Sequence, residues 1–98
     1  MWRSKVYLAF VRQRPCAAIG CSRAADVAHH FGKRYGGGGT GVKPHDSFTV
    51  PLCSPHHIYI HQHNTLQGFQ VSEVEAHFTR LALRILTEWL EGQSDGKS

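Results

Sequence analysis

The central stretch at residues 50–63, VPLCSPHHIYIHQH, concentrates side chains that bind metals and transfer protons. Neutral imidazole is the commonest metal ligand in proteins, and histidine changes its charge near neutral pH. Histidine is otherwise a poor core residue, so a metal site, a proton-transfer site or both would explain the clustering. The residues concerned are Cys53, His56, His57, His61 and His63.

The chain has three cysteines, and an odd number argues against a framework of disulfides. Cys16 and Cys21 form one pair of potential ligands, and Cys53 and His56 form a second pair later in the chain. Zinc accepts thiolate and imidazole in a tetrahedron, so these four residues predict a structural Cys₃His zinc site. The alternative is three reduced cysteines buried as small apolar residues, but the paired spacing favours zinc.

The remaining histidines predict a second, open metal site. Neighbouring helical residues point about 100° apart, whereas residues at i and i+4 share a face. If His56 faces the zinc, His57 and His61 therefore project together on another face of the same helix. His29 and His30 adjoin each other on a predicted strand, so their side chains point to opposite sides. One of them would complete the second metal site, and the other would act as a base on water.

The segments around these residues indicate a small α+β domain. Alternating apolar residues predict strands at residues 5–11, 26–31 and 47–53. The segment GKRYGGGGTGVKP at residues 32–44 contains six glycines and predicts a loop. Pro55 suits the first turn of a helix over residues 56–64.

The clearest predicted helix spans residues 72–91. Ser72 and Glu75 fit a capping box, and Gly92 is predicted to end the helix. We expect one domain over residues 1–92, with its core at residues 15–64 and a flexible tail at 93–98. The helix is amphipathic, and its apolar face is expected to pack on the domain. That face carries Val74, Phe78, Leu81, Ala82, Ile85, Leu86 and Trp89.

The charge is unevenly distributed along the 98 residues. Residues 1–45 contain eight of the eleven Lys and Arg residues and one acidic residue, a net charge of +7, whereas residues 46–98 carry −3. A basic half beside a histidine cluster suggests a polyanion partner, most simply nucleic acid. On charge alone, a solvated surface that happens to be basic fits equally well. The expected contacts to the DNA backbone are Arg12, Arg14, Arg23, Lys33, Arg34 and Lys43.

Several protein classes are disfavoured. No apolar run approaches the ~20 residues that span a bilayer, and the apolar stretch near the start is too short for a signal peptide, so we expect a cytoplasmic protein. The glycines at residues 36–41 either let the backbone approach a phosphate or form a plain connection. They lack the G-x-x-x-x-G-K-[ST] pattern of a nucleotide-triphosphate site.

The motifs AHH at residues 28–30, PLC at 51–53 and HHIYIH at 56–61, together with Asp46, resemble the HNH (His-Me finger) endonucleases. With the glycine loop, the pattern is most similar to small phage and prophage HNH proteins, the group that includes the recombination-enhancement nuclease Ref. The resemblance covers residues 15–61. It implies a ββα-metal core and DNA phosphodiester hydrolysis in phage recombination or DNA processing, inside a bacterial host cell.

The resemblance also implies residue roles. His30 would be the general base, and His29, His57 and His61 would hold a catalytic Mg²⁺, Mn²⁺ or Zn²⁺ ion beside the structural Zn²⁺. Asp46 falls near the position of the asparagine in the family name, so Asp46 or His45 is expected to assist the base or the metal. DNA and a recombinase filament are the partners that this resemblance suggests.

Two other functions fit parts of the same pattern. A catalytically inactive, zinc-stabilised nucleic-acid-binding module would need the cysteines and the basic residues but not His30. A metal hydrolase acting on a small molecule fits less well, because the predicted site has almost no carboxylate ligands and the front half is basic.

Overall fold

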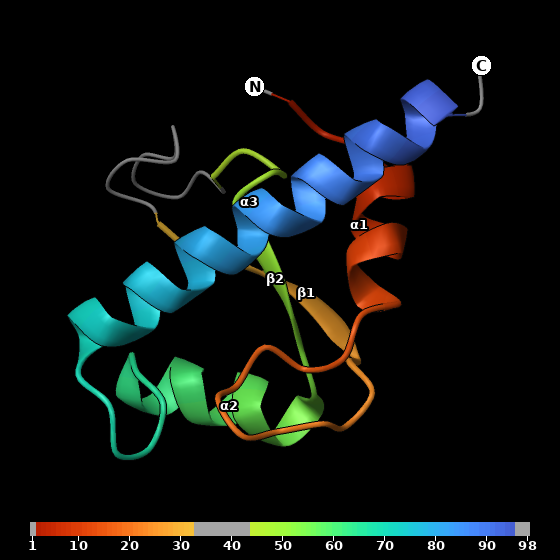
Figure 1. Ribbon diagram of the computed structural model, residues 1–98. Coiled ribbons are helices and arrows are strands. Elements are labelled where there is room, and N and C mark those ends of the chain that lie inside the picture. Colours follow the sequence, from red (N-terminus) through yellow and green to blue (C-terminus); the bar gives the residue numbers. More distant parts are fainter. Residues whose placement is uncertain (1, 33–43, 96–98) are drawn as a thin grey trace.

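A computed structural model describes residues 2–32 and 44–95 of the chain. The element order is α1 (Lys5–Arg12), β1 (Val27–His30), β2 (Thr49–Leu52), α2 (Ser54–His63) and α3 (Val71–Asp95). This confirms a small α+β fold (Figure 1). The glycine loop at residues 36–41 and the predicted DNA contacts Lys33, Arg34 and Lys43 lie outside the described residues.

The two strands form an antiparallel pair that places the paired histidines. Val27 lies opposite Leu52, and His30 lies opposite Thr49. All four residues of β2 are buried, whereas those of β1 are half-buried. β2 is thus the centre of the core, and β1 is the edge that presents His29 and His30.

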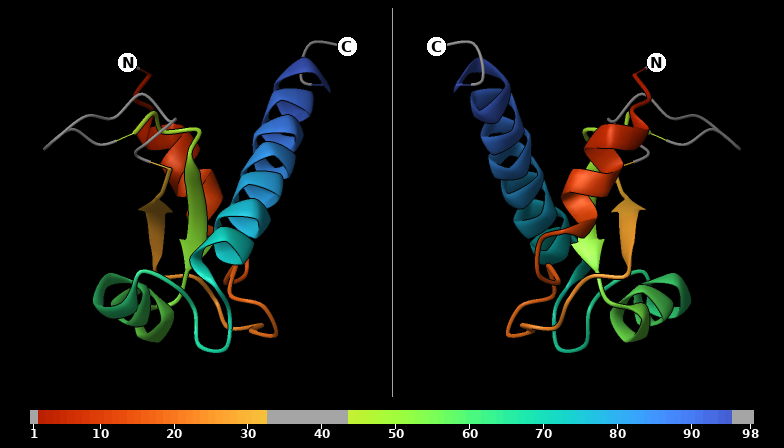
Figure 2. Two further views of the ribbon diagram at one scale, coloured as in Figure 1. Left: turned by 90° about the vertical axis from the view of Figure 1, so that its left-hand side faces the viewer. Right: turned by 90° about the vertical axis from the view of Figure 1, so that its right-hand side faces the viewer.

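The helices surround this pair on different sides. α2 lies across the end of the sheet where β1 begins and β2 ends, while α3 rises along the β2 side (Figure 2). α1 packs against both strands and against α3. The strand pair is therefore followed directly by α2 in the chain. This order brings the histidines of the strand pair and those of the helix toward each other.

The prediction of a strand at residues 5–11 is wrong, because this segment is helix α1. Ser4 caps the helix, with its hydroxyl accepting a hydrogen bond from the Tyr7 N–H at 3.1 Å. Tyr7 and Val11, one turn apart, are completely buried against Ile85 of α3. The aromatic and β-branched residues suggested a strand, but the spacing of the buried pair follows the helical period.

The long helix α3 confirms the predicted apolar face and corrects both of its ends. Val74, Phe78, Ala82 and Ile85 are buried, and the other predicted residues pack beside them. The helix begins at Val71, where the Glu73 carboxylate accepts a hydrogen bond from the Gln70 N–H, so the capping box at Ser72 and Glu75 is wrong. The helix also continues past Gly92 to Asp95, since a glycine weakens a helix without having to end it.

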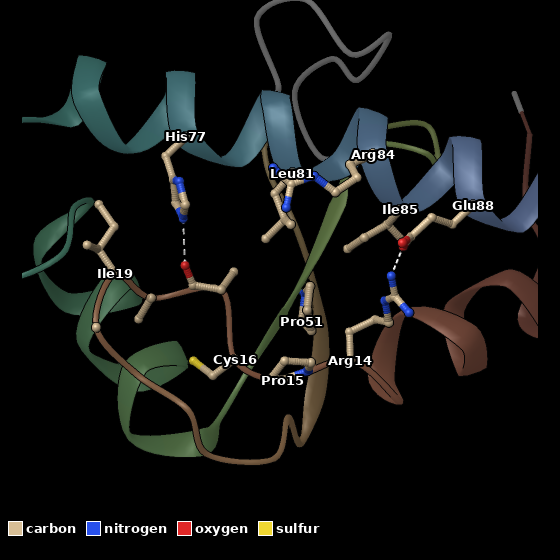
Figure 3. A pocket seen from close by; sticks show the side chains of 13 residues that line it. Arg14, Pro15, Cys16, Ile19, Pro51, His77, Leu81, Arg84, Ile85 and Glu88 are labelled. Atoms are coloured by element: carbon tan, nitrogen blue, oxygen red, sulfur yellow. Dashed lines mark hydrogen bonds and ion pairs between the residues drawn. The ribbon is translucent and has the colours of Figure 1, made fainter.

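Two polar contacts fasten α3 to the cysteine-bearing segment (Figure 3). His77 Nε2 lies 2.8 Å from the carbonyl oxygen of Ala17, and Glu88 forms an ion pair with Arg14. A shallow pocket of about 430 Å³ lies between them, with Pro51 and Leu81 among its lining residues.

Arg14, one of the predicted DNA contacts, is thus engaged by an acidic partner on α3, which weakens its expected role in binding DNA. Arg12 and Arg23 are exposed, and their expected DNA contacts stay predictions.

Candidate metal and proton-transfer site

Four predicted zinc ligands come together at the start of α2. The three thiol sulfurs and one ring nitrogen of Cys16, Cys21, Cys53 and His56 all lie within 4.8 Å of one another. His56 Nδ1 is 3.1 Å from Cys53 Sγ and 3.7 Å from Cys16 Sγ. A tetrahedron with zinc–sulfur bonds of about 2.3 Å has edges of roughly 3.8 Å, so the cluster fits a zinc ion with a small adjustment.

Local backbone contacts hold the first two cysteines. The Cys16 N–H donates to the Arg23 carbonyl at 2.8 Å, and the Cys21 N–H donates to the Ala18 carbonyl at 3.0 Å. Gly20 has a φ of 85°, a left-handed conformation that a residue with a Cβ adopts only with strain. The segment between the two cysteines therefore folds back on itself and turns both thiols toward α2.

Cys53 occupies the N-cap position of α2, but its side chain does not cap the helix. Instead, the Asp26 carboxylate accepts a hydrogen bond from the Ser54 N–H at 2.7 Å, and this bond lowers the pKa of Asp26. An acceptor supplied from outside the helix leaves the Cys53 sulfur to face the other ligands. All three cysteines are free thiols, and burial raises the pKa of the Cys16 thiol to about 11. Metal binding would deprotonate it.

The second predicted cluster also forms, on the other face of α2. Ring nitrogens of His29, His57 and His61 lie within 4.8 Å of one another, and the two helix residues place their Nε2 atoms 2.9 Å apart. Two metal–nitrogen bonds of about 2.1 Å at a right angle would separate these atoms by roughly 3 Å. His56 and His57 are consecutive, so the rotation of one helical residue separates the two clusters.

Burial favours the neutral, metal-binding form of two members of the second cluster, His29 and His57. It lowers the pKa of His29 to about 4, with a smaller contribution from the neighbouring His57 and His61. Burial also lowers the pKa of His57, assisted by His61. Neutral imidazoles have the lone pair that a metal ion needs. The lining of a pocket of about 520 Å³ includes His29, His30 and His61, so the cluster is open to a ligand.

His30 lines the pocket of this cluster, and its ring also contacts a buried carboxylate. Its Nε2 lies 2.8 Å from Asp46 Oδ1, and Asp46 is 3% exposed. A carboxylate only accepts hydrogen bonds, so Nε2 carries the proton and the lone pair of the neutral ring lies on Nδ1. Asp46 therefore fixes the tautomer of His30, as expected for a residue that assists a base. His45 instead interacts with Ser47, with its Nδ1 2.7 Å from the hydroxyl oxygen.

Asp46 is itself held by the N-terminal segment. The Ser4 N–H donates to Oδ2 at 2.7 Å, and Arg3 Nη1 lies 3.1 Å from Oδ1. Burial raises the pKa of Asp46, but the hydrogen bonds from His30, Ser4 and Arg3 outweigh it and the net pKa is lowered. The carboxylate is thus charged at neutral pH. Arg3 was not among the predicted site residues, because nothing in its local sequence links it to a residue more than forty positions away.

Comparison with known proteins places the chain in a family. A family profile with the description "Protein of unknown function (DUF968)" matches residues 1–84. The chain belongs to the DUF968 family. The match includes both ligand clusters, the His30–Asp46 pair and most of α3, so all of these features lie within the DUF968 region.

This DUF968 chain is also similar to a curated bacterial protein. It is 42% identical over 60 residues to "Uncharacterized protein YdfU" of Escherichia coli (strain K12). The aligned segment makes up 61% of this chain and 16% of that protein, so the likeness covers a small part of the longer relative. No solved structure matches the chain. Among the described residues, no helix is both long and apolar enough to cross a membrane.

Proposed function

We propose that this DUF968 chain is a metal-dependent HNH-type endonuclease that hydrolyses DNA phosphodiester bonds. The proposal rests on an oriented base that lies beside an open ligand cluster. The open cluster consists of His29, His57 and His61. His30 is held by Asp46 and lines the same pocket as His29 and His61. The antiparallel strands followed directly by α2 support a ββα-metal core. A structural site alone would not need His30 in this orientation.

Hydrolysis of a phosphodiester needs a better nucleophile than water. Nδ1 of neutral His30 takes a proton from a water molecule in the pocket, and Nε2 keeps its hydrogen bond to Asp46. The carboxylate stabilises the imidazolium that forms. His29, His57 and His61 would hold a divalent ion that stabilises the charge developing on the phosphate and the leaving oxygen. Three imidazoles favour Zn²⁺ or another transition-metal ion for resting affinity, and Mn²⁺ or Mg²⁺ is proposed as the alternative working ion.

DNA is the proposed substrate because the charge favours a polyanion. The first 45 residues carry a net charge of +7, and phosphate neutralisation by Lys and Arg supplies most sequence-independent affinity for DNA. The described residues offer no recognition helix with an array of base-reading side chains on the basic face. We therefore propose cleavage with little sequence preference.

Nicking of a supercoiled plasmid tests the proposal directly. The wild-type protein should nick the plasmid with Mn²⁺ or Mg²⁺, and EDTA should stop the reaction. His30→Ala should reduce the rate by about 10²-fold or more, which is typical for a lost general base, while retaining the metal content of the wild type. Asp46→Asn should reduce it by a similar factor, because an amide that donates to Nε2 moves the ring proton to Nδ1.

A matched control is available on the same helix. His63 packs against Tyr59, with ring centroids 4.3 Å apart, and belongs to neither cluster. His63→Ala should nick at the wild-type rate. Full activity of His30→Ala would refute the proposed mechanism. DNA binding without cleavage in every metal would favour the inactive binding module instead.

A further inference from the structure

A second hollow adjoins His30 on the side of helix α1. Its volume is about 460 Å³, and Arg3, Lys5, His30 and Asp46 line it together with Ser4 and Leu8. His30 also lines the pocket of the open ligand cluster. The ring of the proposed base therefore lies between two hollows, one next to the ligand cluster and one next to two cationic side chains.

The charges in this hollow are unbalanced in favour of an anion. Asp46 is its acidic residue, and both carboxylate oxygens are engaged, by His30 and Arg3 on one side and the Ser4 N–H on the other. Arg3 also donates to the Pro44 carbonyl at 2.6 Å, yet 43% of its side chain is exposed. Lys5 is exposed, and no carboxylate of the described residues forms an ion pair with it.

The position of Lys5 is unfavourable for the helix itself. It is the first residue of α1, whose first turn contains no acidic residue. A cation at a helix N-terminus opposes the helix dipole, whereas an anion there is favourable. The fork of Arg3 is fixed in place by Asp46 and Pro44, and a fixed guanidinium binds a phosphate with little loss of side-chain entropy. The placement of Lys5 does not stabilise α1, and both cations suit a bound phosphate.

We propose that Arg3 and Lys5 form a subsite for a backbone phosphate that flanks the scissile phosphate of a DNA strand. This inference rests on the proposed nuclease function and gives the path of the substrate. The scissile phosphate lies at His29, His57 and His61, the strand passes His30, and the next phosphate enters the hollow. Lys5 contributes charge, and Arg3 both binds the phosphate and positions Asp46.

Salt-dependent binding of a DNA oligonucleotide tests the subsite without cleavage. Fluorescence anisotropy of the full chain, with Ca²⁺ in place of Mn²⁺ or Mg²⁺, gives the slope of log K against log salt concentration. Lys5→Gln should weaken binding about 3- to 10-fold at moderate salt and reduce the slope by about 1, the change expected for one lost phosphate contact. Glutamine retains the helix propensity of lysine, and unchanged melting would show that α1 still folds.

The matched control is Arg80→Gln, which removes an exposed cation of α3 that does not line the hollow. It should leave both slope and affinity close to those of the wild type. Equal slopes for the wild type and Lys5→Gln would overturn the subsite, as would an equal loss in Arg80→Gln. The second outcome would indicate a general effect of net charge.

Cleavage kinetics separate failure of the subsite from failure of the nuclease proposal. Lys5→Gln should raise KM several-fold and leave kcat within about twofold, because it removes binding that is equal in the ground and transition states. If the wild type cleaves and Lys5→Gln shows unchanged KM and slope, only the subsite fails. If the wild type never cleaves but the slope still falls by about 1, the phosphate subsite stands and the nuclease proposal fails.

Discussion

The two ligand clusters lie in different environments, although two consecutive residues of α2 contribute to them, one to each cluster. His56 joins three cysteines, two of which are buried, in a cluster that supplies all four ligands of a tetrahedron. His57 joins His29 and exposed His61 in a cluster of three ligands that borders a pocket. A full ligand set suits structure, whereas an incomplete one leaves room for a substrate and water. One helical step thus separates a cluster whose ligand set is complete from one whose ligand set is open.

The largest expected effect comes from breaking the closed cluster, which is formed by Cys16, Cys21, Cys53 and His56. Cys53→Ser should remove one zinc ion per chain and abolish cooperative thermal unfolding, because structural zinc contributes on the order of 10 kcal/mol to the folding of small domains. Metal analysis together with circular dichroism would measure both. Ser22→Ala, at an exposed position beside Cys21, should leave both unchanged. A Cys53→Ser protein that melts normally would mean that the four residues do not form a structural site.

Breaking the open cluster should instead spare the fold. His57→Ala should lower the affinity for the second metal and reduce plasmid nicking by about 10²-fold or more. The zinc content and the melting temperature should stay close to those of the wild type, because the closed cluster and the core do not use this ring. Loss of zinc or of folding in His57→Ala would show that the two clusters form one structural unit.

The pH dependence of stability tests the carboxylate beside the open cluster. The pKa of Asp46 is lowered in the folded chain, so the unfolded chain binds more protons as the pH falls. The stability supplied by Asp46 is therefore fully present above its ordinary pKa of about 3.9, and it is lost as the pH falls from there through the lower pKa of the folded state. Asp46→Asn should cost about 1–3 kcal/mol at pH 7, because a buried charged hydrogen-bond acceptor is lost.

Urea denaturation at several pH values would measure this effect. The difference in unfolding free energy between the wild type and Asp46→Asn should begin to shrink as the pH falls below about 4, where the unfolded chain takes up the proton. It should be lost once the pH has fallen through the lower pKa of the folded state, because Asp46 is then neutral in both states. A constant difference at all pH values would contradict a charged Asp46 in the folded protein.

The smallest expected effect concerns the helix that the two clusters share. Asp26→Ala removes the acceptor for the Ser54 N–H at the start of α2. It should lower the melting temperature by a few degrees, since the carboxylate is exposed, and leave both metals bound. Asp26→Asn keeps an oxygen acceptor and should recover most of the loss. If Asp26→Ala and the wild type had the same melting temperature, α2 would not need the hydrogen bond to Asp26. Cys53 would then face the other cysteine ligands without it.

Both clusters could be predicted because their geometry follows from local periodicity. His57 and His61 share a face because the helix repeats every 3.6 residues, and His29 and His30 diverge because a strand alternates. The closed cluster followed from the preference of zinc for four thiolate and imidazole ligands. Local reasoning failed at residues 5–11, because a short apolar segment fits a strand or a helix and only packing against α3 selects between them.

The sequence by itself determined which side chains could bind metals and how they divide between two faces, because those relations extend over a few residues. Tertiary structure decided which residues surround His30. Asp46, which precedes β2, reaches His30 at the end of β1, and Arg3 reaches Asp46 from the N-terminal end of the chain. The charge-neutralising contacts around a buried carboxylate depend on distances through space, and no local period of the sequence encodes them.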